Sequence, residues 1–377
     1  MRRENVWPEV FCLFTVALIA QACLGGARAQ EISAGSPVVV TGKFTAPSSN
    51  KDGKPRGISG MACLAPAANG SRECFAVNDE ERFGEVATLT ANELRPTGAI
   101  VTFVAKDDTG QGVVGIARNP MCRDKNGAVD DKPKFGELDG EGVATADGYI
   151  YTASSHSCSG KGKYKPSSYL LTRFRTVDDQ HLLRSTAPAV ERSWRLADAL
   201  LNSTVKDAYG QAKTTGTNIE GIAVINGRLY AGLRTPVTDR ATIVSAPVEG
   251  LFASSNKALD AASVQSIPLD LGKDTGVRDL AALTDGRLLV LSGPTIEQDT
   301  VDYKLWLIEK PLSEGKRVPL AILAPMKAPS GERAKAETVT IISEAPKLEV
   351  LVLYDNIDEG SPMRHELLLP KDTSGLK

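Results

Sequence analysis

The chain has 377 residues, and 44 lysines and arginines nearly balance 46 aspartates and glutamates, for a formal net charge of −2. Because there is no basic excess to neutralise phosphates, the composition argues against a nucleic-acid partner. Beyond a short apolar run near the start, no stretch approaches the roughly 20 apolar residues that cross a bilayer. The sequence therefore predicts a protein without a membrane span.

The first part of the chain has the layout of a cleaved secretory signal. Two arginines precede the apolar run Phe11–Ala20, and Ala27-Arg28-Ala29 supplies the small-x-small pattern that signal peptidase needs. We predict a signal peptide over residues 1–29 and a periplasmic or secreted mature protein. A membrane anchor is the alternative, but the apolar run is too short to span.

Four cysteines remain after the predicted signal. An even number in an oxidising compartment indicates disulfides. Cys63 and Cys74 lie on two strands that we expect to be neighbours, so we predict that they pair and that Cys122 pairs with Cys158. Neither pair has CxxC spacing, which makes zinc or redox chemistry unexpected. Four free buried thiols are the alternative.

Five segments of the chain share one pattern, a short apolar strand, a turn and a second strand. Three of the turns are Asp147-Gly148, Asn226-Gly227 and Asp285-Gly286, dipeptides that reach positive φ at low cost and signal hairpins. A third strand follows in most copies, and often a fourth. The first strands of the five copies are Gly57–Ala62, Gly140–Ala144, Ile219–Ala223, Val277–Ala281 and Ala336–Thr340.

Four strands per repeat is typical of a propeller blade. We predict an all-β fold, a β-propeller of five four-stranded blades, as one domain over residues 30–377 and a monomer. The first two repeats span about 80 residues and the next two about 60, so we expect insertions near 107–136 and 196–215, the second with a short helix. The fifth copy lacks a fourth strand, which the run Pro37–Phe44 can supply to close the ring. Six blades, or a β-sandwich, are the alternatives.

The innermost strand of each blade lines the axis of a propeller, so equivalent positions form a ring. Three carboxylates in one ring repel one another and need a proton or a cation. Arg278 is one internal cation, and Ca²⁺, which takes six to eight oxygen ligands, is the candidate metal, with Glu141, Glu220 and Glu337 as its ligands. The alternative is that each glutamate accepts hydrogen bonds from a neighbouring blade. The predicted ring is Ser59, Glu141, Glu220, Arg278 and Glu337.

A second polar set follows the second strands. Since these strands run antiparallel to the first, their ends return to the end of the axis where the first strands begin. We therefore expect one charged mouth in which the ring is joined by Asp79, His156, Arg234 and Asp355. Clusters that mix charges in this way perturb pKa values and mark functional sites. His156 lies between serines, and a hydrogen-bonded structural role is its alternative.

Several of these segments together resemble a known family. They are the runs from Leu138 to Gly142, Ser154 to Ser157, Asn218 to Ala223, Gly232 to Pro236 and Val277 to Leu280. The chain resembles, over about Arg56 to Tyr354, exported bacterial proteins catalogued as domain of unknown function 3616. The resemblance implies a propeller. More distantly, the Glu-Gly strand start is similar to that of phytase-like and lactonase-like propellers, some of which hold calcium, although a fold does not fix a function.

The sequence thus predicts a propeller that binds a small or polymeric ligand at the charged mouth, with calcium as the candidate cofactor. A hydrolase of phosphoesters or lactones is the first alternative, with a metal-activated water and Glu220 or His156 as the base. A scaffold for protein partners, with the 107–136 insertion as contact surface, is the second.

Overall fold

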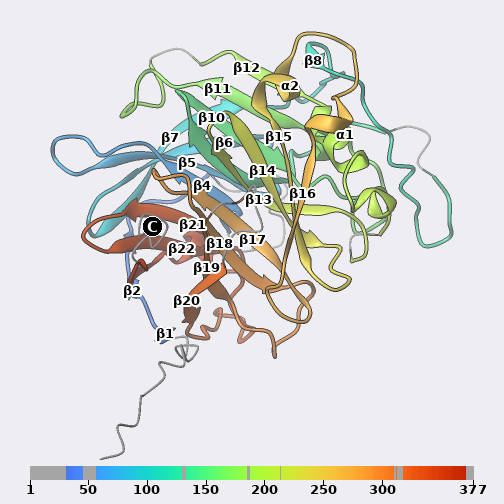
Figure 1. Ribbon diagram of the computed structural model, residues 1–377. Helices are drawn as coiled ribbons and strands as arrows, with labels where there is room; N and C mark the ends of the chain where they lie inside the picture. The colour runs from blue at the N-terminus through green and yellow to red at the C-terminus, as the bar shows by residue number, and fades with distance from the viewer. Residues whose placement is uncertain are drawn as a thin grey trace, which may run out of the picture.

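The computed structural model describes residues 31–45, 57–129, 133–184, 187–212, 214–309, 311 and 317–370. In this part of the chain the strands form five separate sheets, arranged around one axis as the blades of a propeller (Figure 1). The predicted all-β fold with five blades is therefore confirmed. The predicted signal peptide, residues 1–29, lies outside the described residues.

Each blade is an antiparallel meander that runs from the axis outward. Blade 1 contains β4 (Gly60–Cys63), β5 (Arg72–Val77), β6 (Phe83–Leu89) and β7 (Glu93–Thr102). Blade 2 contains β9 (Gly140–Ala146), β10 (Tyr149–Ser154), β11 (Leu171–Arg175) and β12 (Val190–Ser193). Blade 3 contains β13 (Asn218–Ile225), β14 (Arg228–Thr235), β15 (Ala241–Pro247) and β16 (Gln265–Leu269).

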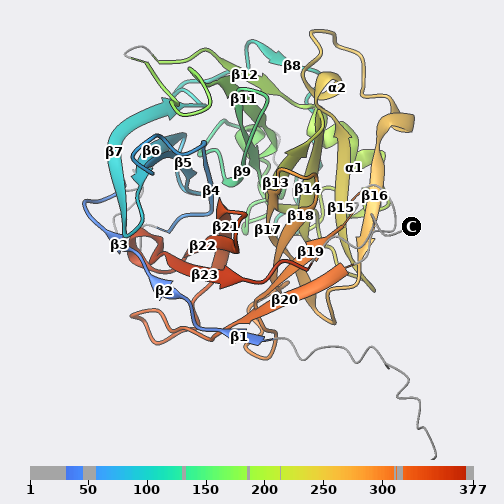
Figure 2. The ribbon, with the colours of Figure 1, turned by 60° about the vertical axis from the view of Figure 1, so that its left-hand side comes forward.

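The last two blades continue this order. Blade 4 contains β17 (Thr275–Ala282), β18 (Leu288–Pro294), β19 (Lys304–Ile308) and β20 (Arg317–Leu323). Blade 5 contains β21 (Ala336–Ser343), β22 (Leu348–Tyr354) and β23 (Met363–Leu367). The innermost strands form a closed ring, since β4 contacts β9, β9 contacts β13, β13 contacts β17, β17 contacts β21, and β21 contacts β4 (Figure 2).

The N-terminal segment runs along the outer edges of three blades (Figure 2). β1 (Glu31–Ser33) pairs parallel with β20 of blade 4, and β2 (Ser36–Pro37) pairs antiparallel with β23 as the fourth strand of blade 5. β3 (Val39–Val40) then pairs parallel with β7 of blade 1. Of the predicted closing strand, Pro37–Phe44, only Pro37 pairs within blade 5. The chain crosses to blade 1 after the two paired residues of β2.

The two predicted insertions lie where the repeats are longest. The first contributes β8 (Val113–Val114), which adds a parallel fifth strand to blade 2. The second begins with α1 (Arg195–Leu201), as predicted, and continues with the 3₁₀ turn η2 (Lys206–Ala208). Shorter helical segments connect other strands, namely η1 (Pro166–Tyr169), α2 (Val248–Phe252), η3 (Ala261–Ser263) and η4 (Asp358–Gly360). Neither insertion contains a sixth blade among the described residues.

The glycine that follows the ring position lets neighbouring blades approach closely. A Cβ on Gly60 would lie 2.2 Å from the carbonyl oxygen of Glu141, and one on Gly221 would lie 2.4 Å from the Cα of Asp279. In blade 4 the equivalent residue is Asp279, whose carboxylate accepts hydrogen bonds from the backbone N–H groups of Leu280 and Val339, both 2.7 Å away. Burial raises the pKa of Asp279 well above its usual range. A polar side chain therefore connects blades 4 and 5, whereas blade 1 meets blade 2, and blade 3 meets blade 4, at a glycine that has no side chain.

Both predicted disulfides are present. Cys63 on β4 bonds to Cys74 on β5 within one blade, and Cys122 of the first insertion bonds to Cys158. The second bond ties the insertion to blade 2, beside the buried Tyr169. Among the helices of the described residues, none is long and apolar enough to cross a membrane.

Candidate ligand-binding site

A β-bulge occurs at the same place in the innermost strands of blades 2 to 5. The pairing register skips Glu141, Glu220, Arg278 and Glu337, while the residues on either side of each stay paired with the second strand. A bulge bends its strand and re-aims the extra side chain. This repeated irregularity therefore takes the four ring side chains out of the sheet ladder at one end of the axis.

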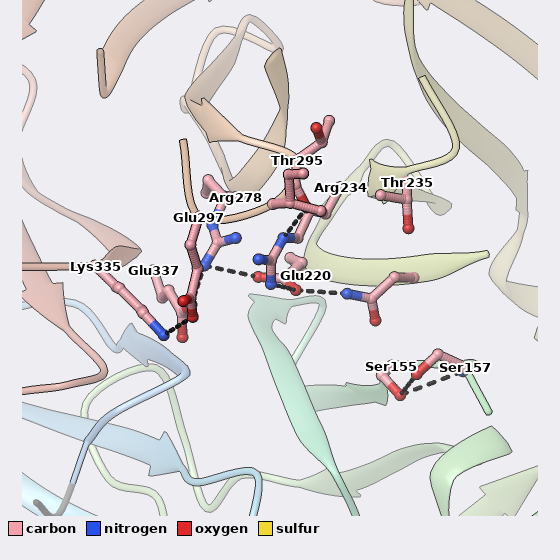
Figure 3. Close-up of polar contacts among 12 residues, drawn as sticks. Ser155, Ser157, Glu220, Arg234, Thr235, Arg278, Thr295, Glu297, Lys335 and Glu337 are labelled. Carbon is pink, nitrogen blue, oxygen red and sulfur yellow. Dashed lines mark hydrogen bonds and ion pairs between the residues drawn. The ribbon is translucent and has the colours of Figure 1, made fainter. Parts of the chain in front are cut away.

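The guanidinium of Arg278 joins two of the ring carboxylates. Its Nη2 contacts Oε1 of Glu337 and lies 3.3 Å from Oε2 of Glu220. Glu220 also accepts from Nη1 of Arg234 at 3.2 Å and from the amide of Asn218 at 2.7 Å. Figure 3 shows Arg278 between Glu337 and Glu220, with Arg234 beside it. The structure thus brings together three predicted ring residues and one residue of the second set.

These groups are deeply buried. The exposed fraction is 1% for Arg278, 3% for Glu220 and 7% for Glu337. Burial lowers the pKa of Arg234, but the charges of Glu220 and Glu141 outweigh it and hold that pKa above its usual range. A guanidinium stays ionised in such a setting. The site therefore holds two ionised guanidinium groups that are paired with buried carboxylates.

The other two ring members are also buried. Ser59 is 1% exposed, and its hydroxyl has no hydrogen-bond partner among the described residues. Glu141 is 5% exposed and close enough to influence Arg234 electrostatically. Among the described residues no group of three His, Cys, Asp or Glu side chains is arranged to hold a metal ion. The guanidinium of Arg278 lies between Glu220 and Glu337, two of the three glutamates predicted as calcium ligands.

His156, a further member of the second set, lies in a different environment in blade 2. His156 is fully buried, its ring packs against Tyr169 at 5.6 Å, and Nδ1 lies 2.9 Å from the carbonyl oxygen of Ser154. Burial lowers the pKa of His156 to about 4. Asp355 follows β22 and bonds through its backbone N–H to Lys335, and Asp79 follows β5 on blade 1. The imidazole thus belongs to an aromatic cluster in blade 2.

A cavity of about 490 Å³ opens above Arg234 and Arg278. Its walls come from the loop between β18 and β19 and from the segment between β20 and β21. Sequence reasoning missed these walls, although Lys335 lies only two residues before the ring position Glu337. Residues that define the cavity include Arg234, Arg278, Ile296, Glu297, Met326 and Lys335.

Charged side chains at the rim of this cavity are paired with one another. Lys335 Nζ lies 2.5 Å from Glu297, and Arg333 lies 3.8 Å from Asp302. The Lys335–Glu297 pair connects the two walls (Figure 3). The rim is therefore close to electrically balanced, while Arg234 and the almost fully buried Arg278 lie at the floor.

The fold and the site together define a five-bladed β-propeller with a charged cavity at one end of its axis. Residues 193–368 match the family model described as Protein of unknown function (DUF3616), which confirms the resemblance predicted from the sequence. No curated protein matches the chain.

Solved structures resemble the chain weakly. A hypothetical protein from Leishmania major is 11% identical, with a TM-score of 0.42, and the alignment covers 90% of this chain and 91% of that one. An engineered GH43 glycoside hydrolase is 8% identical, with a TM-score of 0.47, over 85% of this chain and 51% of that one. An α-L-arabinofuranosidase from Clostridium thermocellum is 7% identical, with a TM-score of 0.45, over 83% and 90%. Likeness at this level carries no information about activity.

Proposed function

We propose that the protein binds a small anionic ligand at the cavity above Arg278, through oxygen atoms that accept hydrogen bonds from the two floor arginines. One observation carries the proposal. Arg278 lines the cavity at 1% exposure, and its Nε–H has no hydrogen-bond partner among the described residues. A buried donor left in this state costs about 1–3 kcal/mol, so a group that satisfies it is expected.

The surrounding contacts favour an oxygen ligand. Glu220 and Glu337 engage Nη2 of Arg278 and fix the plane of the guanidinium. Its Nε–H has no acceptor among the described residues, and arginine is suited to planar recognition of carboxylate or phosphate oxygens. A volume of about 490 Å³ lies within the range of small-molecule pockets, about 300–1,000 Å³. The cavity therefore suits a small molecule more than a polymer.

Hydrolysis is less well supported than binding. The two residues predicted as catalytic bases do not face one cavity: Glu220 accepts from Asn218 and Arg234, and His156 packs against Tyr169. We also propose that the protein acts in an oxidising compartment outside the cytoplasm, because it holds two disulfides.

Binding of small carboxylates to the purified, oxidised protein tests the proposal. Galacturonate and octanoate serve as probes in calorimetric titrations, with and without Ca²⁺. Arg278→Lys keeps the charge but removes the Nε donor, and we expect it to weaken binding about tenfold or more, since a hydrogen bond to a charged group is worth about 1.5–3 kcal/mol. Arg317→Lys, on the outer strand β20, is the matched control and should leave binding unchanged. Equal affinities of the wild type and Arg278→Lys would refute the assignment.

A further inference from the structure

Apolar side chains border the cavity on both of its walls. Ile296 is 46% exposed at the rim, although it is a large hydrophobic residue, and Pro325 and Met326 lie on the facing segment. Single exposed apolar residues are common on protein surfaces and need no explanation. Here, however, the exposed Ile296 and Pro325 and the half-buried Met326 border a cavity that has two arginine side chains at its floor. A ligand that covers these apolar residues removes their surface from water, which is favourable.

The aromatic residue in the cavity lining is not available for stacking. Tyr303 is 6% exposed, and the guanidinium of Arg333 lies 5.1 Å from the centre of its ring. Its other surroundings include Gly293, where a Cβ would come within 2.4 Å of the ring. Sugar rings usually pack their C–H faces on aromatic rings, and the ring of Tyr303 leaves no open face for that contact.

The charges of the cavity point to a ligand with one anionic end. At the rim, Lys335 is paired with Glu297 and Arg333 with Asp302. At the floor, Nε–H of Arg278 has no hydrogen-bond partner in the part of the chain that the structure describes. A ligand with several anionic groups would place some of them beside the rim carboxylates, where they would be repelled.

We propose that the ligand is an amphipathic monocarboxylate. Its carboxylate accepts from Nε of Arg278 with Arg234 alongside, and its aliphatic body lies on Ile296, Pro325 and Met326. This inference rests on the proposed function and specifies the ligand class for the same site.

Calorimetric titration with butyrate, octanoate and galacturonate tests the proposal. Each added methylene contributes about 0.8 kcal/mol when buried, so octanoate should bind more tightly than butyrate by about 2- to 4-fold per methylene. Ile296→Ser should weaken octanoate binding about tenfold and leave butyrate binding unchanged. Ile100→Ser, at a site 43% exposed on β7 of blade 1, is the matched control and should change neither.

The outcomes separate this inference from the proposed function. If galacturonate binds more tightly than octanoate and Ile296→Ser has no effect, the amphipathic ligand is refuted while anion binding at Arg278 stands. If none of the three carboxylates binds to the folded protein at millimolar concentration, both proposals fail. Octanoate affinity that falls in Ile296→Ser and in Arg278→Lys, but not in Ile100→Ser, is the expected result.

Discussion

Removing the guanidinium of Arg278 should destabilise the fold strongly. Arg278→Met keeps a side chain of similar length but leaves the Glu337 carboxylate without the donor that now contacts it, at 7% exposure. Glu220 keeps its contacts with Arg234 and Asn218, so most of the lost stability comes from the Glu337 carboxylate. Breaking a buried ion pair by removing one partner costs about 3–5 kcal/mol. We therefore expect a loss of about 3–5 kcal/mol in the free energy of unfolding at pH 7.

A double-mutant cycle distinguishes this mechanism from simple loss of packing. Arg278→Met leaves the charge of Glu337 without its partner, and Glu337→Gln removes that charge. The double variant should therefore be more stable than Arg278→Met alone. Urea denaturation of the oxidised proteins gives the free energies, followed by the fluorescence of Trp194 and Trp306. Residues in direct contact typically couple by about 0.5–3 kcal/mol in such cycles.

Two results would refute the reasoning. One is a decrease in the free energy of unfolding of less than about 1 kcal/mol for Arg278→Met. That result would mean that the carboxylates do not depend on the charge of Arg278. The other is additivity of the two substitutions, which would mean that Arg278 and Glu337 do not stabilise one another.

Three further predictions concern pH, the rim and a disulfide. As the pH falls, the unfolded state takes up the proton of His156 first, because the folded pKa is about 4 and the unfolded value is near 6.5. The stability that neutral His156 contributes above pH 6.5 should therefore decline by about 1.4 kcal/mol per pH unit down to about pH 4. Burial also lowers the pKa of His365 to about 4, so some decline should remain in His156→Gln. Urea titrations at pH 7 and 5 should show a shallower decline in His156→Gln than in the wild type, and equal slopes would contradict the argument. Glu297→Gln should tighten carboxylate binding by about 2- to 5-fold in calorimetry, because an exposed carboxylate near the ligand is removed, and weaker binding would contradict this. Replacing Cys122 and Cys158 by alanine opens a loop with a sequence separation of 36 and should lower the unfolding free energy by about 4 kcal/mol. Replacing Cys63 and Cys74, with a separation of 11, should lower it by about 3 kcal/mol. The reverse order would count against the loop-entropy account.

Local turn chemistry made the blades predictable from the sequence. Asn226 and Gly227 both have positive φ in the hairpin between β13 and β14, and Asp147 and Gly148 do the same between β9 and β10. Such turns fix the register of the strands that they join, and the register in turn places the ring positions. The five ring residues could therefore be aligned with one another from the sequence alone.

The outer parts of the blades were less predictable. β12 of blade 2, residues Val190–Ser193, was not predicted, because it follows a long connection and has no turn dipeptide before it. The N-terminal run pairs with β23 up to Pro37 and then with β7 of the next blade. These two sheet edges lie side by side only after the ring of blades has closed. Tertiary contact rather than local propensity determines these short strands.

The cavity was not predictable for a related reason. Ile296 and Lys335 lie in connections without periodicity, and nothing in their sequence shows that the two connections face one another. The orientation of His156 was equally hidden, since its positive φ of 53° and its burial against Tyr169 depend on the chain around it. Sequence reasoning located the ring positions in the innermost strands, but it could not show which side chains of the second set face them.

The asymmetry of the ring and the position of the cavity have a common structural origin. In blades 1 to 3 a glycine follows the ring position, and the next blade packs directly on it. Blades 4 and 5 have Asp279 and Thr338 there, and both reach across to backbone groups of the next blade. Blade 4 is also the blade in which the ring residue is Arg278, and its loop between β18 and β19 forms one wall of the cavity. Arg278 and Asp279 thus depart from the repeat in the same blade whose loop forms one wall of the cavity.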